Sequence, residues 1–195
     1  MASRFRGLES IEQIVTGRQL DVDPEGCWKA VVFYEEIPIR PPWLLRMLLP
    51  LPVRAAGAKS RPGARVDCIY AGGTLTKLIT AIEAPRKIEF DVIDQQLGIE
   101  ASVAALNGSY TILPSGRGST ILLMTRYRSY LAPRWLFRPL ERLVLHALHG
   151  HVLRGLEVRL QYCSEVPDRE SLMTTTEEAH AYAGHILSTP PSAAR

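Results

Sequence analysis

Five strand-like runs of β-branched, aromatic and aliphatic residues follow one another between residues 64 and 130, with only short turns between them. The runs are Ala64–Tyr70, Gly73–Glu83, Lys87–Gln95, Glu100–Leu113 and Ser119–Tyr130. Glycine and proline residues mark the turns. Parallel strands need long crossover connections, and these intervals leave no room for them. The spacing therefore predicts a meander of antiparallel strands.

A long helix is expected directly after these strands. Residues 133–161 read as one helix, which Pro139 is expected to bend. A sheet with one apolar face must be covered, and this helix is long enough to cover it. We therefore expect an α+β fold in which a curved antiparallel sheet wraps around a long C-terminal helix.

The segments outside the meander are expected to be short. In chain order they are a helix over residues 10–15, a strand over 28–37, a helix over 43–49, a linker over 54–63, and a helix over 175–187 before a disordered tail. We expect one domain over residues 28–161, from the strand that begins at Trp28 to the end of the long helix. An N-terminal extension over 1–27 and a C-terminal extension over 162–195 flank it.

The composition limits the classes of protein to which the chain can belong. It has 195 residues, of which 46% are hydrophobic and 22% charged, as in globular proteins, so a disordered chain or a coiled coil is excluded. The net charge of +3, carried by scattered arginines, does not indicate nucleic-acid binding. The three cysteines form no CxxC pair, and the first residues have no apolar core of a signal peptide. We expect a cytoplasmic protein without a transmembrane helix.

Four phrases carry a resemblance to a known superfamily. They are VVFYEEIP, LTKLITAIEAPRKIEFDV, GSYTILPSGRGSTILLMTRY and RPLERLVLHALHGHVLRGLEVRL. Their order and spacing resemble the helix-grip fold of the START-like superfamily, also called SRPBCC, which includes polyketide cyclases/dehydrases and lipid-transfer domains. The resemblance covers roughly residues 28–161 and implies an apolar cavity between sheet and helix. It implies no single catalytic motif, so it transfers no active-site residue.

The long helix carries two candidate polar residues on its predicted apolar face. On a helical wheel this face contains Leu140, Leu143, Val144, Ala147, Leu148, Gly155 and Val158. His151 falls near its middle and Glu141 toward one edge, whereas His146 and His149 fall mostly on the other face. Either His151 is a core histidine with a hydrogen bond and Glu141 pairs with an arginine at the rim, or both are polar groups that orient a ligand. As such a pair they could serve as general acid and base. No metal site is expected, because His151 points away from His146 and His149.

Two tyrosines are candidate lining residues of the cavity. Alternation along the last strand places Tyr127 on the more apolar face, with Ile121, Leu123 and Thr125, and this face is expected to be concave. Tyr34 lies on one face of the strand expected from Trp28. Each hydroxyl is expected either to contact a ligand or to bond to the backbone as a core tyrosine.

The segment WLLRMLL, residues 43–49, has six apolar residues in seven. Trp43, Leu45 and Leu48 are therefore candidate ligand-binding residues. The segment is either a core helix that closes one end of the cavity, a lid, a contact of a homodimer, or a wedge for transient contact with a membrane. Arginines such as Arg40 and Arg46 surround it, which suits an anionic membrane or an amphiphilic acid.

Three functions remain open on these grounds. The first is binding or transport of an apolar small molecule, such as a lipid, isoprenoid or polyketide-like compound, without a cofactor. The second is a polyketide cyclase or dehydratase that uses Glu141 and His151. The third is a protein-interaction module that uses the helix over residues 43–49. We favour the first, because the sequence has an inferred cavity and no motif for a catalytic triad or a metal.

Overall fold

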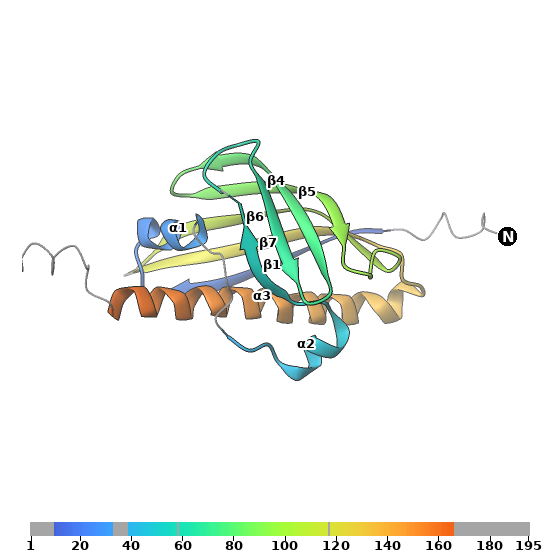
Figure 1. Ribbon diagram of the computed structural model, residues 1–195. Coiled ribbons are helices and arrows are strands. Elements are labelled where there is room, and N and C mark those ends of the chain that lie inside the picture. Colours follow the sequence, from blue (N-terminus) through green and yellow to red (C-terminus); the bar gives the residue numbers. More distant parts are fainter. Residues whose placement is uncertain (1–9, 33–38, 58, 117, 166–195) are drawn as a thin grey trace, which may run out of the picture. The chain divides into compact units, whose positions relative to one another are not determined.

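The structure is a computed structural model that describes residues 10–32, 39–57, 59–116 and 118–165 (Figure 1). The chain divides into a compact unit over residues 1–160 and a second unit over residues 161–195. The first unit contains the whole sheet and nearly all of the long helix. Of the second unit, only the end of that helix lies among the described residues.

Seven antiparallel strands form a single sheet in the order β1-β7-β6-β5-β4-β3-β2. The strands are β1 (Ser10–Leu20), β2 (Pro52–Ala56), β3 (Arg65–Tyr70), β4 (Gly73–Glu83), β5 (Lys87–Gln96), β6 (Val103–Ser115) and β7 (Gly118–Ser129). The helices are α1 (Pro24–Val32), α2 (Trp43–Leu48) and α3 (Arg134–Glu165). The predicted meander and long helix are confirmed, with strand ends within three residues of those expected.

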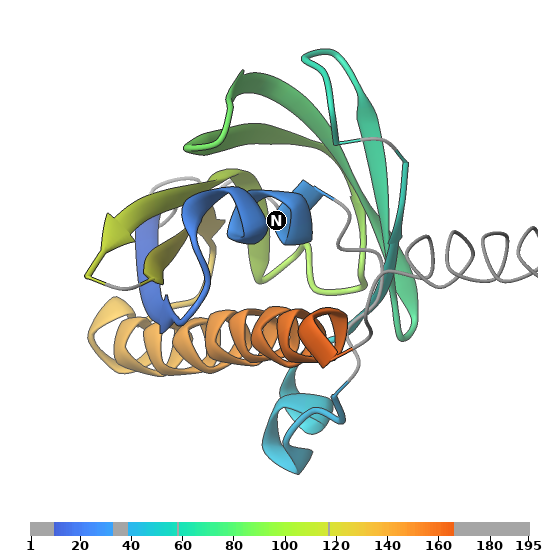
Figure 2. The ribbon, with the colours of Figure 1, turned by 90° about the vertical axis from the view of Figure 1, so that its left-hand side faces the viewer.

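The sheet curls over α3 like a half-barrel (Figure 2). Register shifts interrupt the β4–β5 pairing at Thr76/Lys77 and Ile79/Ala81 and the β6–β7 pairing at Ala105/Asn107. Such bulges bend a strand and increase its twist, which supports the curvature. The core lies on the concave side, where residues from the sheet meet α1 and α3. Its most buried members include Cys27, Val66, Ile88, Ile112, Ile121, Leu153 and Leu156.

The N-terminal part of the fold differs from the sequence-based prediction. Ser10–Val15 belongs to strand β1 rather than to a helix, because the segment pairs with β7 along its whole length. The residues Trp28–Val32 lie in helix α1 rather than in a strand. The Asp23 side chain accepts a 2.9 Å hydrogen bond from the Gly26 backbone N–H, as a helix N-cap does, and Pro24 follows it as the first helical residue. The fold thus begins before residue 28, where we expected the domain to start.

The linker expected over residues 54–63 is also partly wrong. Residues Pro52–Ala56 form edge strand β2, which pairs with β3. Proline is tolerated at the start of an edge strand because its missing N–H is not needed by a second neighbour. The C-terminal helix expected over residues 175–187 and the strand residues 33–37 lie outside the described residues.

The buried face of α3 is rotated from the one that the helical wheel predicted. Leu143 is 64% exposed, whereas His149 is 3% exposed and Glu141 is 7% exposed. Leu153 and Leu156 continue the buried face along the helix. Hydrogen bonds between polar residues of α3 and the sheet determine this rotation. A helical wheel considers one helix alone, so it cannot include these partners.

Candidate functional site

A pocket of about 380 Å³ lies between the concave face of the sheet and α3. Its wall comes from β3–β7, from α3 and from the segment that follows α2. Leu75, Val92, Leu123, Val144 and Leu148 make much of it apolar. A pocket of this size and lining suits a small apolar molecule.

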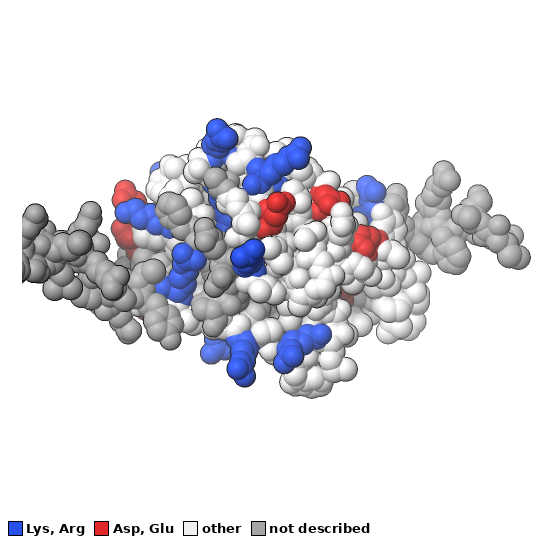
Figure 3. Space-filling view, in the orientation of Figure 1, with Lys and Arg blue, Asp and Glu red and all other residues white. Residues whose placement is uncertain are grey.

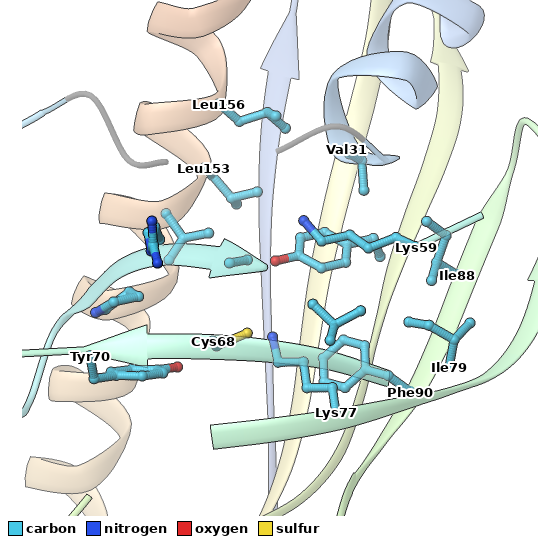
Figure 4. A pocket seen from close by; sticks show the side chains of 16 residues that line it. Val31, Lys59, Cys68, Tyr70, Lys77, Ile79, Ile88, Phe90, Leu153 and Leu156 are labelled. Atoms are coloured by element: carbon cyan, nitrogen blue, oxygen red, sulfur yellow. The ribbon is translucent and has the colours of Figure 1, made fainter. Parts of the chain in front are cut away.

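A smaller pocket of about 90 Å³ adjoins the first (Figure 4). The two pockets share the lining residues Pro52, Tyr70, Lys77, Phe90, Tyr110 and Val152. The smaller pocket extends toward α1 and the far end of α3, where Val31 and Leu156 line it. The two pockets are therefore adjacent on the concave side of the half-barrel.

One end of the larger pocket is held by a network around Glu141. The Ser129 hydroxyl donates to Glu141 Oε1 at 2.6 Å, and the Arg134 guanidinium donates to the same oxygen at 2.8 Å. The Tyr127 hydroxyl donates to Glu141 Oε2 at 3.3 Å. Arg134 also pairs with Glu12 of β1 at 3.1 Å. The network therefore joins the start of α3 to β7 and β1, and it gives Glu141 the partners that a buried carboxylate requires.

Tyr127 remains a neutral hydrogen-bond donor in this network. Burial, together with the charge of the Glu141 carboxylate, raises the pKa of Tyr127 to about 12. Tyr127 is 1% exposed, and both it and Glu141 line the larger pocket. The expected concave position of Tyr127 is observed. Its hydroxyl is directed to Glu141, so the alternative of a backbone partner is not what the structure contains.

A second polar chain crosses from α3 to the sheet through His149. The Thr125 hydroxyl lies 2.9 Å from His149 Nε2, and the Thr16 hydroxyl lies 3.2 Å from His149 Nδ1. Thr16 Oγ1 is also 2.8 Å from His146 Nδ1. Burial, with the charge of His146, lowers the pKa of His149 to about 4, so its ring is neutral near pH 7. The wheel had assigned His149 to the outer face, and the hydrogen bonds from both β1 and β7 explain the difference.

His151 does not meet Glu141. The two residues are ten positions apart on one helix, which separates them by roughly 15 Å along its axis. His151 is buried at 6% exposure, and burial lowers its pKa. It is absent from the described lining of both pockets, since it lies about 200° around α3 from His149. The two residues therefore do not form the acid–base pair that the sequence had left open.

Lys77 is a site residue that the sequence analysis did not select. It lies on β4 between Leu75 and Ile79 on the concave face, and it lines both pockets. Its ammonium group is 4.4 Å from the centroid of the Phe90 ring. Gly108 of β6 makes room for this ring, because a Cβ atom there would be 2.6 Å from Phe90 Cζ. The signal in the sequence was the alternation Leu75-Lys77-Ile79, a lysine among inward-facing residues.

The three candidates of the apolar segment have different environments. Trp43 is 71% exposed and is not among the described residues that line a pocket. Leu45 is buried, whereas Leu48 is half-exposed and lines the larger pocket. In Figures 1 and 2, α2 lies below α3, and Figure 3 shows uncharged surface there with basic side chains beside it. Tyr34 lies outside the described residues.

No protein-family model matches the chain, and no curated protein matches it in sequence. Solved structures do match. A protein of Thermus thermophilus is 16% identical, has a TM-score of 0.54, and covers 79% of this chain and 100% of its own. A protein of Mesorhizobium loti is 17% identical, with a TM-score of 0.52 and coverages of 80% and 100%.

A third neighbour is norcoclaurine synthase of Thalictrum flavum, solved with dopamine and hydroxybenzaldehyde. It is 13% identical, with a TM-score of 0.51, and the match covers 83% of this chain and 95% of the enzyme. The curled sheet with its long C-terminal helix is the architecture that agrees with these structures. The chain has the helix-grip fold. At these identities the likeness shows the fold alone, and it confirms the curved antiparallel sheet around a long C-terminal helix that we expected.

The described residues also bear on a metal site, a membrane-spanning helix and reactive thiols. No group of three or more His, Cys, Asp or Glu side chains in this part of the helix-grip chain is placed to hold a metal ion. None of its described helices is long and apolar enough to cross a membrane. Cys27 and Cys68 are buried free thiols, and burial, with the charge of Asp23, raises the pKa of Cys27 to about 11.

Proposed function

We propose that the protein binds or carries an apolar small molecule, such as a lipid, isoprenoid or polyketide-like compound, in the pocket between the sheet and α3. The observation that carries this proposal is the 380 Å³ pocket with its largely aliphatic and aromatic wall. Burying an apolar ligand against such a wall is favourable at roughly 25 cal/mol for each Å² removed from water. The helix-grip neighbour solved with two small aromatic molecules supports the view that this fold can hold such ligands.

Binding is a better proposal than a cyclase or dehydratase reaction. Glu141 already accepts hydrogen bonds from Ser129, Tyr127 and Arg134, so its role in holding α3 accounts for its burial. The distance between Glu141 and His151 along α3 argues against a shared proton transfer.

The proposal is tested with a neutral fluorescent probe, phenylnaphthylamine. Ala105 lines the larger pocket, so Ala105→Phe should fill part of it and abolish saturable probe binding. Ala104 is the matched control, because it is the adjacent residue and its side chain is on the opposite face of β6. Ala104→Phe should bind the probe as the unchanged protein does. Absence of saturable binding to the unchanged protein, or equal binding to all three proteins, would contradict the proposal.

We also propose that α2 touches an anionic membrane surface, from which such a ligand could enter. Trp43 and Met47 are 71% and 75% exposed, and Leu48 connects this surface to the larger pocket. Arg46 lies on the same helix and Arg54 on the neighbouring strand β2, and both are exposed. Large apolar side chains beside cations favour the interface of an anionic membrane.

A further inference from the structure

Lys77 introduces a positive charge into an otherwise apolar part of the half-barrel. Its neighbours on the same face of β4 are Leu75 and Ile79, which are both buried. The Lys77 side chain runs from the strand into the smaller pocket, and its ammonium group ends near Cys68 (Figure 4). Since Lys77 lines both pockets, this charge lies where they join.

Lys77 keeps its charge, because burial lowers its pKa but interactions with Cys68, Tyr110 and Tyr70 raise it by more. Its contacts within the protein include the face of the Phe90 ring, whose centroid is 4.4 Å from the ammonium group, and the Cys68 thiol. No Asp or Glu among the described residues forms an ion pair with it. An ammonium group withdrawn from water is costly unless an anion or several hydrogen bonds compensate it. A cation–π contact offsets only part of this cost.

The described charged side chains that line the smaller pocket have the same sign. The described residues that line the smaller pocket include the cations Arg54, Lys59 and Lys77, and no carboxylate. The larger pocket is also lined by the carboxylate of Glu141, and this carboxylate is already paired with Arg134. The junction of the pockets is therefore a positive region next to an apolar one.

Two phenol groups at this junction can donate hydrogen bonds to an anion. Tyr70 and Tyr110 line both pockets, and both interact electrostatically with Lys77. Burial raises the pKa of Tyr70 to about 12 and raises that of Tyr110 as well, so both keep their protons near neutral pH. The ammonium group and both neutral hydroxyl groups can donate hydrogen bonds. An anionic group requires such donors.

We propose that the ligand is an amphiphilic acid whose anionic head group pairs with Lys77 while its apolar tail occupies the larger pocket. The proposal rests on the binding function proposed above and narrows the class of ligand. The carboxylate of a fatty acid and the phosphate of a monoalkyl phosphate share the required charge. A neutral alcohol of equal chain length has the same tail and lacks the charge.

The experiment measures displacement of phenylnaphthylamine by dodecanoate, by dodecyl phosphate and by dodecanol. Lys77→Met keeps most of the length of the side chain and removes its charge. It should weaken the binding of one or both anions by about tenfold or more. The affinity for dodecanol should change by less than about threefold. Lys29→Met is the matched control, because it removes the same charge from an exposed position on α1. Lys77→Arg should restore most of the binding of the anion.

The outcomes separate the two proposals. Loss of anion binding in Lys77→Met alone supports the pairing, and the weakened anion identifies the head group as carboxylate or phosphate. If the probe binds but Lys77→Met affects acid and alcohol equally, or affects neither, the pairing is wrong while the pocket still binds apolar molecules. If no probe, acid or alcohol binds the unchanged protein, both proposals are overturned. Circular dichroism and thermal melting of Lys77→Met and Lys77→Arg check that each variant is folded.

Discussion

At the scale of single residues, the polar groups that line the larger pocket differ in what they do. Glu141 is a fully partnered carboxylate between β7 and the first turns of the helix. His149 is a neutral ring held by threonines of two strands. Lys77, in contrast, is a cation without an ion pair to any described carboxylate. A buried polar group that has all its partners contributes to structure, whereas a half-buried cation on a pocket wall without a carboxylate partner marks a place for an anionic ligand.

Glu141 should therefore matter for stability more than for binding. Glu141→Leu leaves the Ser129 hydroxyl and the Arg134 guanidinium without their carboxylate, and it should lower the free energy of unfolding by about 3 kcal/mol. Arg138→Leu is the control, since Arg138 belongs to the same network through Glu12 and its side chain is 58% exposed. It should cost less than about 1 kcal/mol. Urea denaturation measures both. An unchanged stability in Glu141→Leu with weaker probe binding would assign Glu141 to the ligand instead.

At the scale of elements, α2 differs from the other helices in how little of it is buried. Among its described side chains Leu45 is buried, at 2% exposure, whereas Trp43, Met47 and Leu48 keep much of their surface in water. A helix of six residues is too short to be stable by itself. It needs an additional contact to bury its apolar surface, and the membrane proposed above would provide one.

Replacing the exposed side chains of α2 should reduce binding to vesicles. The double change Trp43→Ser and Met47→Ser should weaken co-sedimentation with phosphatidylglycerol vesicles by roughly tenfold or more, because each large apolar side chain contributes ~1.5–3 kcal/mol when it leaves water. Phosphatidylcholine vesicles should bind the unchanged protein less.

The matched control changes two exposed apolar residues elsewhere. Ile11 and Val15 are 55% and 45% exposed on β1, so Ile11→Ser with Val15→Ser removes a similar kind of surface. Equal vesicle binding by both double variants would contradict a role for α2. A molecular mass that rises with concentration in the unchanged protein but not in the α2 variant would assign this surface to a second copy of the chain.

At the scale of the whole molecule, the polar contacts of α3 couple protonation to folding. The folded state keeps His149 neutral down to about pH 4, whereas the unfolded chain takes up the proton near pH 6.5. The stability due to the neutral ring is thus fully present above pH 6.5, and it is lost as pH falls from there toward 4. Burial also lowers the pKa of His151, which adds a loss in the same direction.

The free energy of unfolding should therefore fall between pH 6.5 and 4, with at most about 3 kcal/mol of the loss due to His149. His149→Leu removes this proton uptake, so the variant should show a shallower dependence on pH over the same range. His146→Leu is the comparison, because it also removes a bond to Thr16 and the smaller, electrostatic cause of the lowered pKa of His149 but leaves the buried ring in place, so it should change the slope less than His149→Leu. Urea denaturation at several pH values measures the slopes. Identical slopes for the unchanged protein and both variants would contradict the role of His149.

Local patterns were sufficient for the parts of the fold that depend on neighbours in sequence. The turns between residues 64 and 130, the alternation that places Tyr127 inward, and the length of the last helix each follow from short-range preferences, and together they predicted the antiparallel sheet and its covering helix. The start of α1 was also readable, since Asp23 and Pro24 are a helix start signal that the sequence analysis overlooked. These features need no knowledge of what lies across the fold.

Tertiary structure alone decided the rest. β1 is a strand because β7, more than ninety residues away in sequence, offers it hydrogen-bonding groups. α3 is rotated because Thr16, Thr125 and Ser129 bond to its polar residues, and these partners come from two other strands. Lys77 became a candidate site residue only when the curled sheet brought Phe90 and the two tyrosines around it. A side chain's partners across a fold depend on pairing register and curvature, which the local sequence does not encode.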